Sequence, residues 1–141
     1  MRVDDVLALE TWSRLDKDQT SQLIDVRTKS EWTFVGIPDL SSLGRQVLFL
    51  EWQTFPEGYL DTAFVPRLCS LLQNSKLSSD THLFFICRTG GRSRMAAVAM
   101  TEAGYRYCYN VADGFEAPLD SNRQRGNIAG WKASGLPWQQ G

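Results

Sequence analysis

The sequence predicts an α/β fold in which helices cover both faces of a mostly parallel sheet. Short apolar runs rich in β-branched residues alternate with segments whose apolar residues recur every three or four positions. The run from His82 to Ile86 has so little polar alternation that it suits a central strand buried on both faces. Strands that alternate with helices in this way are joined by crossover connections and lie parallel.

The composition is that of an ordinary globular protein. We expect a single domain over residues 1–141, because this length suffices for one core of two or three layers. The apolar and charged fractions, 43% and 22%, are typical of folded domains, and a net charge of −1 gives no general affinity for nucleic acid. No membrane partner is expected, because no apolar run approaches the roughly 18 residues of a membrane span. Three widely spaced cysteines fit neither a disulfide framework nor a metal-binding pair, so we expect a reducing, cytoplasmic location or an organelle matrix.

The first third of the chain is predicted to contain two helices and a strand. A helix is expected over residues 3–16, where apolar residues recur at helical spacing. Leu23 to Val26 is a short buried strand, with Asp25 near the carboxyl end that faces functional loops in such sheets. Thr28 to Glu31 matches a capping box and predicts one or two helical turns that Pro38 ends.

The remaining elements follow from the same two periodicities, with caps and glycines at their ends. They are a strand over 47–50, a helix with Asp61 or Thr62 as N-cap, the strand over 82–86, a helix over 93–103 stopped by Gly104, a strand over 105–111, and a short helix with an apolar anchor over 130–138.

Two further groups of side chains are interpreted from their positions in the sequence. Arg27 and Glu31 are close enough in sequence to pair across their turn, as a structural or surface ion pair. The loop over residues 51–59 contains Trp52 and Phe55, which either line a pocket mouth or close the core.

Two cysteines and the single histidine are expected to be structural. Cys69 and Cys108 fall on the apolar sides of their elements, as inert core residues do. His82 begins the strand that ends just before Cys87, so an extended strand separates it from that thiol and excludes it as the catalytic base.

The strongest functional signal is the loop that follows the central strand. There the apolar run stops at Cys87, and a Gly-rich basic segment over residues 88–93 leads into an Ala-rich helical pattern. Successive backbone N–H groups of a tight loop and a helix N-terminus concentrate positive partial charge and bind anions. This field and the nearby arginines favour the thiolate, which is the nucleophilic form of cysteine. The sequence therefore places a nucleophile and an anion pocket in one short loop.

A series of short motifs occurs in the same order as in a known family. The motifs are Leu23-Ile24-Asp25-Val26-Arg27, Glu31-Trp32, Gly36-Ile37-Pro38, Cys87-Arg88-Thr89-Gly90-Gly91-Arg92-Ser93, Asn110-Val111-Ala112-Asp113-Gly114-Phe115 and Gly130-Trp131. Together they resemble the landmarks of a single-domain rhodanese (thiosulfate sulfurtransferase). The resemblance implies a rhodanese-like fold with a mostly parallel, five-stranded sheet.

The resemblance also implies a two-step reaction. Cys87 would attack the outer sulfur of thiosulfate or a similar donor, release sulfite and hold the sulfur as a persulfide. Cyanide or a cellular thiol, free or on a protein, would then accept that sulfur. No metal or organic cofactor is needed, because the cysteine itself carries the sulfur.

The implied substrate-binding residues are those of the loop: Arg88, Thr89, Gly90, Gly91, Arg92 and Ser93. Backbone N–H groups of residues 88–92 would stabilise the persulfide, and Arg88 and Arg92 would bind the dianionic donor. Gly90 and Gly91 would permit the tight loop conformation. Ser93 would either cap the following helix or donate a hydrogen bond to the sulfur.

The length and sequence of the same loop distinguish this chain from proteins of related folds that have other functions. Phosphatases and arsenate reductases of this kind have a longer loop between cysteine and arginine and usually a histidine before the cysteine, where this chain has Ile86. A noncatalytic rhodanese-like module is disfavoured by the retention of Cys87. A sulfur-relay protein that docks to another protein stays open, because it would use the same thiol.

The chain departs from the family pattern in two places. Val35 precedes Gly36-Ile37-Pro38 where many relatives read Gly-His-Ile-Pro. Asp113 replaces the first of two glycines, and an insertion over residues 116–129 precedes Trp131. We expect the insertion to affect how an acceptor docks and not the chemistry at Cys87.

Overall fold

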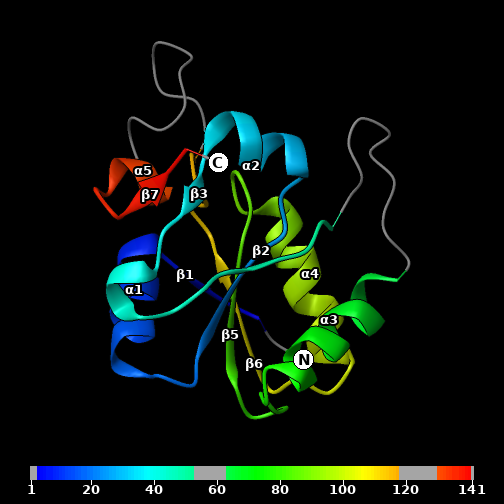
Figure 1. Ribbon diagram of the computed structural model, residues 1–141. Coiled ribbons are helices and arrows are strands. Elements are labelled where there is room, and N and C mark those ends of the chain that lie inside the picture. Colours follow the sequence, from blue (N-terminus) through cyan, green and yellow to red (C-terminus); the bar gives the residue numbers. More distant parts are fainter. Residues whose placement is uncertain (1–2, 53–62, 118–129, 141) are drawn as a thin grey trace.

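A five-stranded sheet forms the centre of the molecule. The computed structural model describes residues 3–52, 63–117 and 130–140. The strand order is β1-β6-β5-β2-β4, and every neighbouring pair is parallel. These strands are β1 (Asp4–Val6), β2 (Gln22–Asp25), β4 (Leu48–Phe49), β5 (His82–Ile86) and β6 (Tyr107–Val111). The predicted α/β class with a parallel five-stranded sheet is confirmed (Figure 1).

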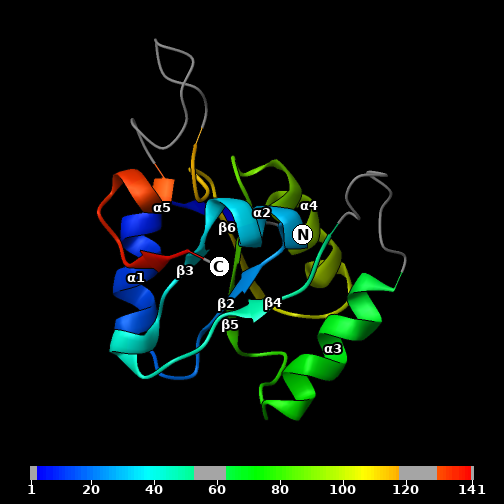
Figure 2. The ribbon, with the colours of Figure 1, turned by 45° about the horizontal axis from the view of Figure 1, so that its top comes forward.

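Helices cover both faces of this sheet (Figure 2). On one face lie α3 (Phe64–Asn74) and α4 (Gly91–Glu102), and on the other lie α1 (Ala8–Lys17) and α5 (Gly130–Ala133). The short helix α2 (Lys29–Val35) follows β2, and a 3₁₀ turn, η1 (Ser41–Leu43), lies between the strands β3 (Ile37–Pro38) and β4. In the described residues, no helix has the length and apolarity needed to cross a membrane.

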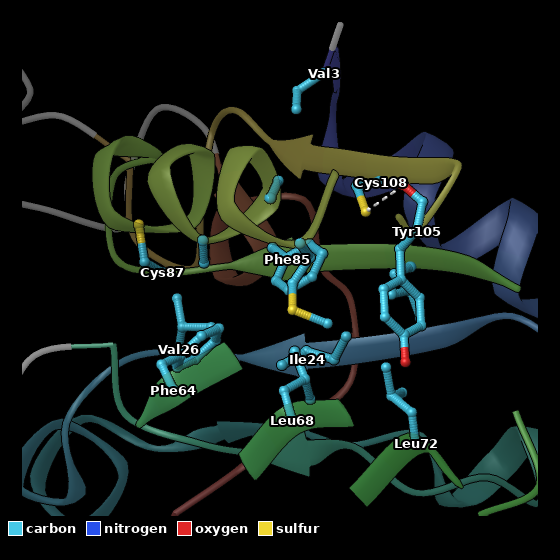
Figure 3. Close-up of a cluster of buried hydrophobic side chains, with 14 residues drawn as sticks. Val3, Ile24, Val26, Phe64, Leu68, Leu72, Phe85, Cys87, Tyr105 and Cys108 are labelled. Carbon is cyan, nitrogen blue, oxygen red and sulfur yellow. Dashed lines mark hydrogen bonds between the residues drawn. The ribbon is translucent and has the colours of Figure 1, made fainter. Parts of the chain in front are cut away.

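The central strand β5 supplies side chains to two separate hydrophobic cores. Leu83 and Phe85 pack with the residues of α3 and α4 (Figure 3), whereas Phe84 and Ile86 pack with those of α1 and α5. All four side chains are fully buried. This alternation is the period of two expected for a strand covered on both faces.

The prediction of one helix over residues 3–16 is wrong at its start. Residues Asp4–Val6 instead form β1, the edge strand beside β6, and Ala112 N–H donates to the Val6 carbonyl at 2.8 Å. A strand of three residues is too short to show a period of two, so the apolar spacing of the helix that follows obscured it. Pairing with β6, a tertiary contact, decides the conformation.

The helix α2 has the predicted capping box. The Thr28 hydroxyl accepts a hydrogen bond from Glu31 N–H at 3.3 Å, and the Glu31 carboxylate accepts one from Thr28 N–H at 3.2 Å. The helix ends at Val35, before Gly36, so Pro38 does not end it as predicted. Pro38 lies in β3, which pairs antiparallel with β7 (Trp138–Gln139).

Two other helices differ from prediction at their starts. Helix α4 begins at Gly91, two residues earlier than predicted, and ends at Glu102; Ala103 is its C-cap, and Gly104 follows the cap with a positive φ as expected. Helix α3 has Ala63 as its N-cap, while the predicted caps Asp61 and Thr62 lie outside the described residues.

The aromatic loop after β4 is described only up to Trp52. The Trp52 ring packs edge-on against Phe64 of α3, with ring centroids 4.9 Å apart. Trp52 thus helps to close the core, whereas Phe55 lies outside the described residues.

Candidate active site

Cys87 directly follows β5 at the carboxyl edge of the sheet. The residue exposes 1% of its surface and belongs to the core on the α3–α4 side. Figure 3 shows its sulfur directed toward the first turn of α4 and away from Val26 and Phe64. The thiol is therefore presented to the N-terminus of a twelve-residue helix, where unpaired N–H groups favour negative charge.

Three hydrogen-bonding groups surround the sulfur atom. The backbone N–H groups of Gly90 and Ser93 donate to Sγ at 3.2 and 3.3 Å, and the Ser93 hydroxyl lies 3.2 Å away. These N–H groups belong to the N-cap residue and the third residue of α4. An anionic sulfur at this position is stabilised by both N–H groups and by the helix dipole.

A chain of hydrogen bonds leads from the thiol to the protein surface. The Ser93 hydroxyl donates to Asn110 Oδ1 at 2.6 Å, and Asn110 Nδ2 donates to Asp5 Oδ1 at 3.0 Å. Because Asp5 takes the amide N–H, the amide oxygen of Asn110 faces Ser93 and accepts its only hydroxyl proton. The Ser93 oxygen, 3.2 Å from the sulfur, is then left to accept from the Cys87 thiol while that thiol is protonated, so Asp5 and Asn110 fix how Ser93 contacts the sulfur.

The turn after β6 is hydrogen-bonded to the backbone of the cysteine loop. Phe115 N–H donates to the Cys87 carbonyl at 2.8 Å, and Glu116 N–H donates to the Arg88 carbonyl at 3.1 Å. Gly114 has a φ of +64°, and a Cβ there would collide with the Arg88 carbonyl. Gly114 is therefore required for the close contact between this turn and the loop.

The buried arginine of the Asp-Val-Arg motif binds its own aspartate. Arg27 Nε and NH2 donate to the Asp25 carboxylate, the shortest distance being 2.7 Å, and both side chains are fully buried. Arg27 NH2 also donates to the Gly36 carbonyl at 2.9 Å, and the guanidinium stacks on the Phe115 ring at 4.2 Å. The predicted pairing of Arg27 with Glu31 is therefore wrong. The aspartate is nearer because alternate residues after a strand share a side.

Glu31 binds Arg92 instead, and this pair joins α2 to the first turn of α4. Arg92 NH1 lies 2.6 Å from Oε1 and NH2 lies 2.9 Å from Oε2, a two-pronged ion pair. Burial alone would raise the pKa of Glu31, but Arg92 and the hydrogen bonds from Thr28 lower it to about 2. The hydrogen bonds to Glu31 raise the pKa of Arg92, and the charge of Cys87 adds to that rise. Arg92 directly precedes Ser93, whose backbone N–H contacts the sulfur, so the guanidinium charge belongs to the surroundings of the thiol.

Comparisons with known proteins identify the family of this chain. The family described as "STR4 middle domain" matches residues 5–141, which is nearly the whole chain. The chain belongs to this rhodanese-like family.

Relatives of this rhodanese-like chain cover its full length. An uncharacterized protein of Rickettsia conorii is 37% identical over 139 residues, 99% of both chains. The crystal structure of Rv0390 from M. tuberculosis is 42% identical, covers 100% of both chains and has a TM-score of 0.87. The polysulfide-sulfur transferase homodimer from Wolinella succinogenes is 20% identical, covers 97% of this chain and 78% of its own, and has a TM-score of 0.60, so it shows the fold alone.

The loop residues of the rhodanese-like chain have unequal roles in the structure. Gly90 and Ser93 contact the sulfur directly, and Ser93 is the third residue of α4 and not its cap. Arg88 is exposed, and Thr89 is half-buried beside it. Gly91 begins α4 with open space where a Cβ would project, so it is not required for the loop as predicted.

The site of this rhodanese-like chain also contains residues that the sequence analysis did not assign to it. The sequence analysis used Asn110 only as part of a family motif. A buried asparagine in a strand needs hydrogen-bond partners for its amide group, and this was the available signal. Asp5 lies far away in sequence, and only the pairing of β1 with β6 brings it to Asn110.

The other ionisable groups of interest have structural partners. Burial raises the pKa of the Cys108 thiol to about 11, and that thiol donates to the Tyr105 carbonyl at 3.7 Å (Figure 3). His82 stacks on Tyr107 and contacts Arg14 and Tyr109 at the opposite end of β5. Cys69 is half-buried against the α3–α4 core. Among the described residues, no cluster of His, Cys, Asp or Glu is arranged to hold a metal ion.

Proposed function

We propose that this chain is a sulfurtransferase that carries a sulfane sulfur as a persulfide on Cys87. The observation that carries the proposal is the sulfur atom itself, which is buried and accepts two backbone N–H groups at the start of α4. Both N–H groups converge on Cys87 Sγ, where they stabilise the thiolate that the first step requires. The short spacing between Cys87 and Arg92 supports a sulfurtransferase rather than a phosphatase.

In the proposed first step, the Cys87 thiolate attacks the outer sulfur of thiosulfate or a similar sulfane donor. A sulfur–sulfur bond to Cys87 forms while the bond between the two donor sulfurs breaks, and sulfite leaves with that electron pair. The negative charge remains on the new terminal sulfur, near the N–H groups of the loop. The cysteine itself is the sulfur carrier.

In the proposed second step, a nucleophile attacks the terminal sulfur of the persulfide. Cyanide would leave as thiocyanate, and a cellular thiol would leave as a persulfide, in both cases returning the Cys87 thiolate. The acceptor in the cell is a small thiol or a protein thiol. A cytoplasmic location, where thiols stay reduced, suits this chemistry.

Mass spectrometry tests the proposal directly. After incubation with thiosulfate or a small persulfide, Cys87 should gain the mass of one sulfur atom, and cyanide should remove it as thiocyanate. The Cys87→Ser variant should gain none, because it lacks the carrier. The Cys69→Ser variant is the matched control and should be loaded like the wild type, because Cys69 lies in α3 and not in the cysteine loop.

Two results would contradict the sulfurtransferase assignment. The first is a Cys87→Ser variant that still produces thiocyanate. The second is a wild-type protein that gains no sulfur but hydrolyses an aryl phosphate, which would favour the phosphatase alternative.

A further inference from the structure

The guanidinium of Arg92, in the first turn of α4 after Cys87, is already paired with the Glu31 carboxylate. Both terminal nitrogens of Arg92 bind Glu31, at 2.6 and 2.9 Å, and the two side chains expose only 20% and 18% of their surfaces. Two-pronged pairs of this kind are the strongest arginine–carboxylate contacts. A donor anion that bound Arg92 would therefore compete with Glu31.

Glu31 is held as an anion by more than Arg92. The Thr28 N–H and hydroxyl groups lie 3.2 and 3.1 Å from Oε1, and these contacts fix the carboxylate at the start of α2. Its pKa of about 2 means that it stays charged at neutral pH. The charge of Glu31 is therefore a permanent part of the site.

Two other arginines near the loop also have carboxylate partners, and one does not. Arg27 binds Asp25 in the core, and Arg94 binds Asp5 at 3.1 Å. In the part of the chain that the structure describes, Arg88 has no carboxylate partner and is exposed. The cysteine loop thus offers one uncompensated arginine charge to an incoming donor.

We propose that Glu31 is a specificity-determining residue that, by holding Arg92, makes the site favour a singly charged sulfane donor over dianionic thiosulfate. The inference rests on the proposed function and names the donor class of the same site. The Coulomb energy of a donor scales with its charge, so each charge near the pocket acts twice as strongly on thiosulfate as on a monoanion. Glu31 thus penalises the dianion more.

A small persulfide anion, R–S–S⁻, is the simplest donor of the favoured class. The Cys87 thiolate attacks its outer sulfur, and a new sulfur–sulfur bond forms. The bond to the inner sulfur breaks, and its electron pair leaves as the thiolate R–S⁻. The atoms and charges balance without an oxidant or reductant.

The Glu31→Gln variant tests the inference in a donor comparison. The initial rate of sulfur loading on Cys87 is measured at low concentrations of thiosulfate and of 2-hydroxyethyl persulfide. Loading by thiosulfate should rise about tenfold, and loading by the persulfide should rise about threefold or less, because the dianion gains twice the electrostatic energy. Glutamine also suits the third position of a capping box, so α2 should still form.

Two further variants identify the cause. In the double variant Glu31→Gln, Arg92→Gln, the gain for thiosulfate should disappear, because no freed guanidinium remains. The Glu51→Gln variant is the matched control, since Glu51 also caps α2, through Lys29 N–H at 3.0 Å, but does not contact Arg92. It should leave the ratio of the two donor rates unchanged.

The outcomes separate this inference from the proposed function. If Cys87 is loaded in the wild type but Glu31→Gln leaves the donor ratio unchanged, the inference is wrong and the sulfurtransferase assignment stands. A thiosulfate gain that persists without Arg92 also overturns it. If neither donor loads wild-type Cys87, the proposed function is wrong, and the donor preference is wrong with it.

Discussion

Gly90 and Gly91 are neighbours in the cysteine loop, but only Gly90 needs to be glycine. Gly90 has a φ of +102°, and a Cβ there would collide with the Ala112 carbonyl of the turn after β6. Gly91 is the first residue of α4, and a Cβ there would meet no atom within 4 Å. The two positions therefore provide a matched pair for testing the loop.

We expect Gly90→Ala to lower the free energy of unfolding by at least about 2 kcal/mol, through backbone strain and the displaced turn. Gly91→Ala should be neutral or stabilising by up to about 1 kcal/mol, because alanine restricts the unfolded chain and favours the helix. Denaturant unfolding measures both values. Equal losses in the two variants would show that the loop does not have the conformation described.

At the scale of the elements, the ion pair of Asp25 and Arg27 connects β2 to the end of α2. Arg27 binds Asp25 at 2.7 Å and the Gly36 carbonyl at 2.9 Å, so one guanidinium contacts the strand and the residue that ends the helix. Both side chains are fully buried. Such a pair adds no more to the free energy of unfolding than well-packed apolar residues would, but removing one partner lowers that free energy strongly because the other charge stays buried.

The Asp25→Ala variant should lose about 3–5 kcal/mol of unfolding free energy, because Arg27 would remain buried without its counter-ion. Asp80→Ala is the matched control, since Asp80 pairs with Arg106 at 3.4 Å on the surface, with both side chains mostly exposed. Its unfolding free energy should change little. Thermal or denaturant unfolding of the two variants compares them, and a small loss for Asp25→Ala would contradict the buried pair.

At the scale of the whole molecule, the Glu31–Arg92 pair makes stability depend on pH. The pKa of Glu31 is about 2 in the folded chain and is ordinarily 4.5. Above pH 4.5 the carboxylate is ionised in both states, and its contribution is complete. As the pH falls from 4.5 toward 2, the unfolded chain binds a proton that the folded chain does not, so folding is weakened.

We expect the difference in unfolding free energy between wild type and Glu31→Gln to shrink as the pH falls from 6 to 2. The shrinkage should amount to about 3 kcal/mol, from the lowering of the Glu31 pKa. Denaturant titrations at several pH values measure it. Because the same pH changes act on every other carboxylate in both proteins, a difference that stays constant would contradict the strong pairing of Glu31.

The sequence was most informative where one local pattern decides the structure. The apolar run from His82 to Ile86 matches β5 residue for residue, and the capping box at Thr28 and Glu31 forms as predicted. The position of the cysteine loop was predicted because the apolar strand pattern stops there and a helical pattern begins. Each of these features depends on residues that are close together in the chain.

The features that the sequence did not show depend on contacts between distant residues. β1 exists because β6 is beside it, and Asn110 meets Asp5 only through that pairing. The choice of partner for Glu31 was wrong because sequence proximity favoured Arg27, whereas the start of α4 brings Arg92 to it. The insertion over residues 116–129 lies almost wholly outside the described residues.

The burial of Cys87 has a consequence for the shape of its partners. Because the residue exposes 1% of its surface, an incoming group can touch only a small part of it. Under the proposed function, a flat protein surface laid over the loop would make little contact with this residue, whereas a small nucleophile needs only that small area. A protein that takes sulfur from this chain would therefore have to carry its thiol on a thin, protruding segment.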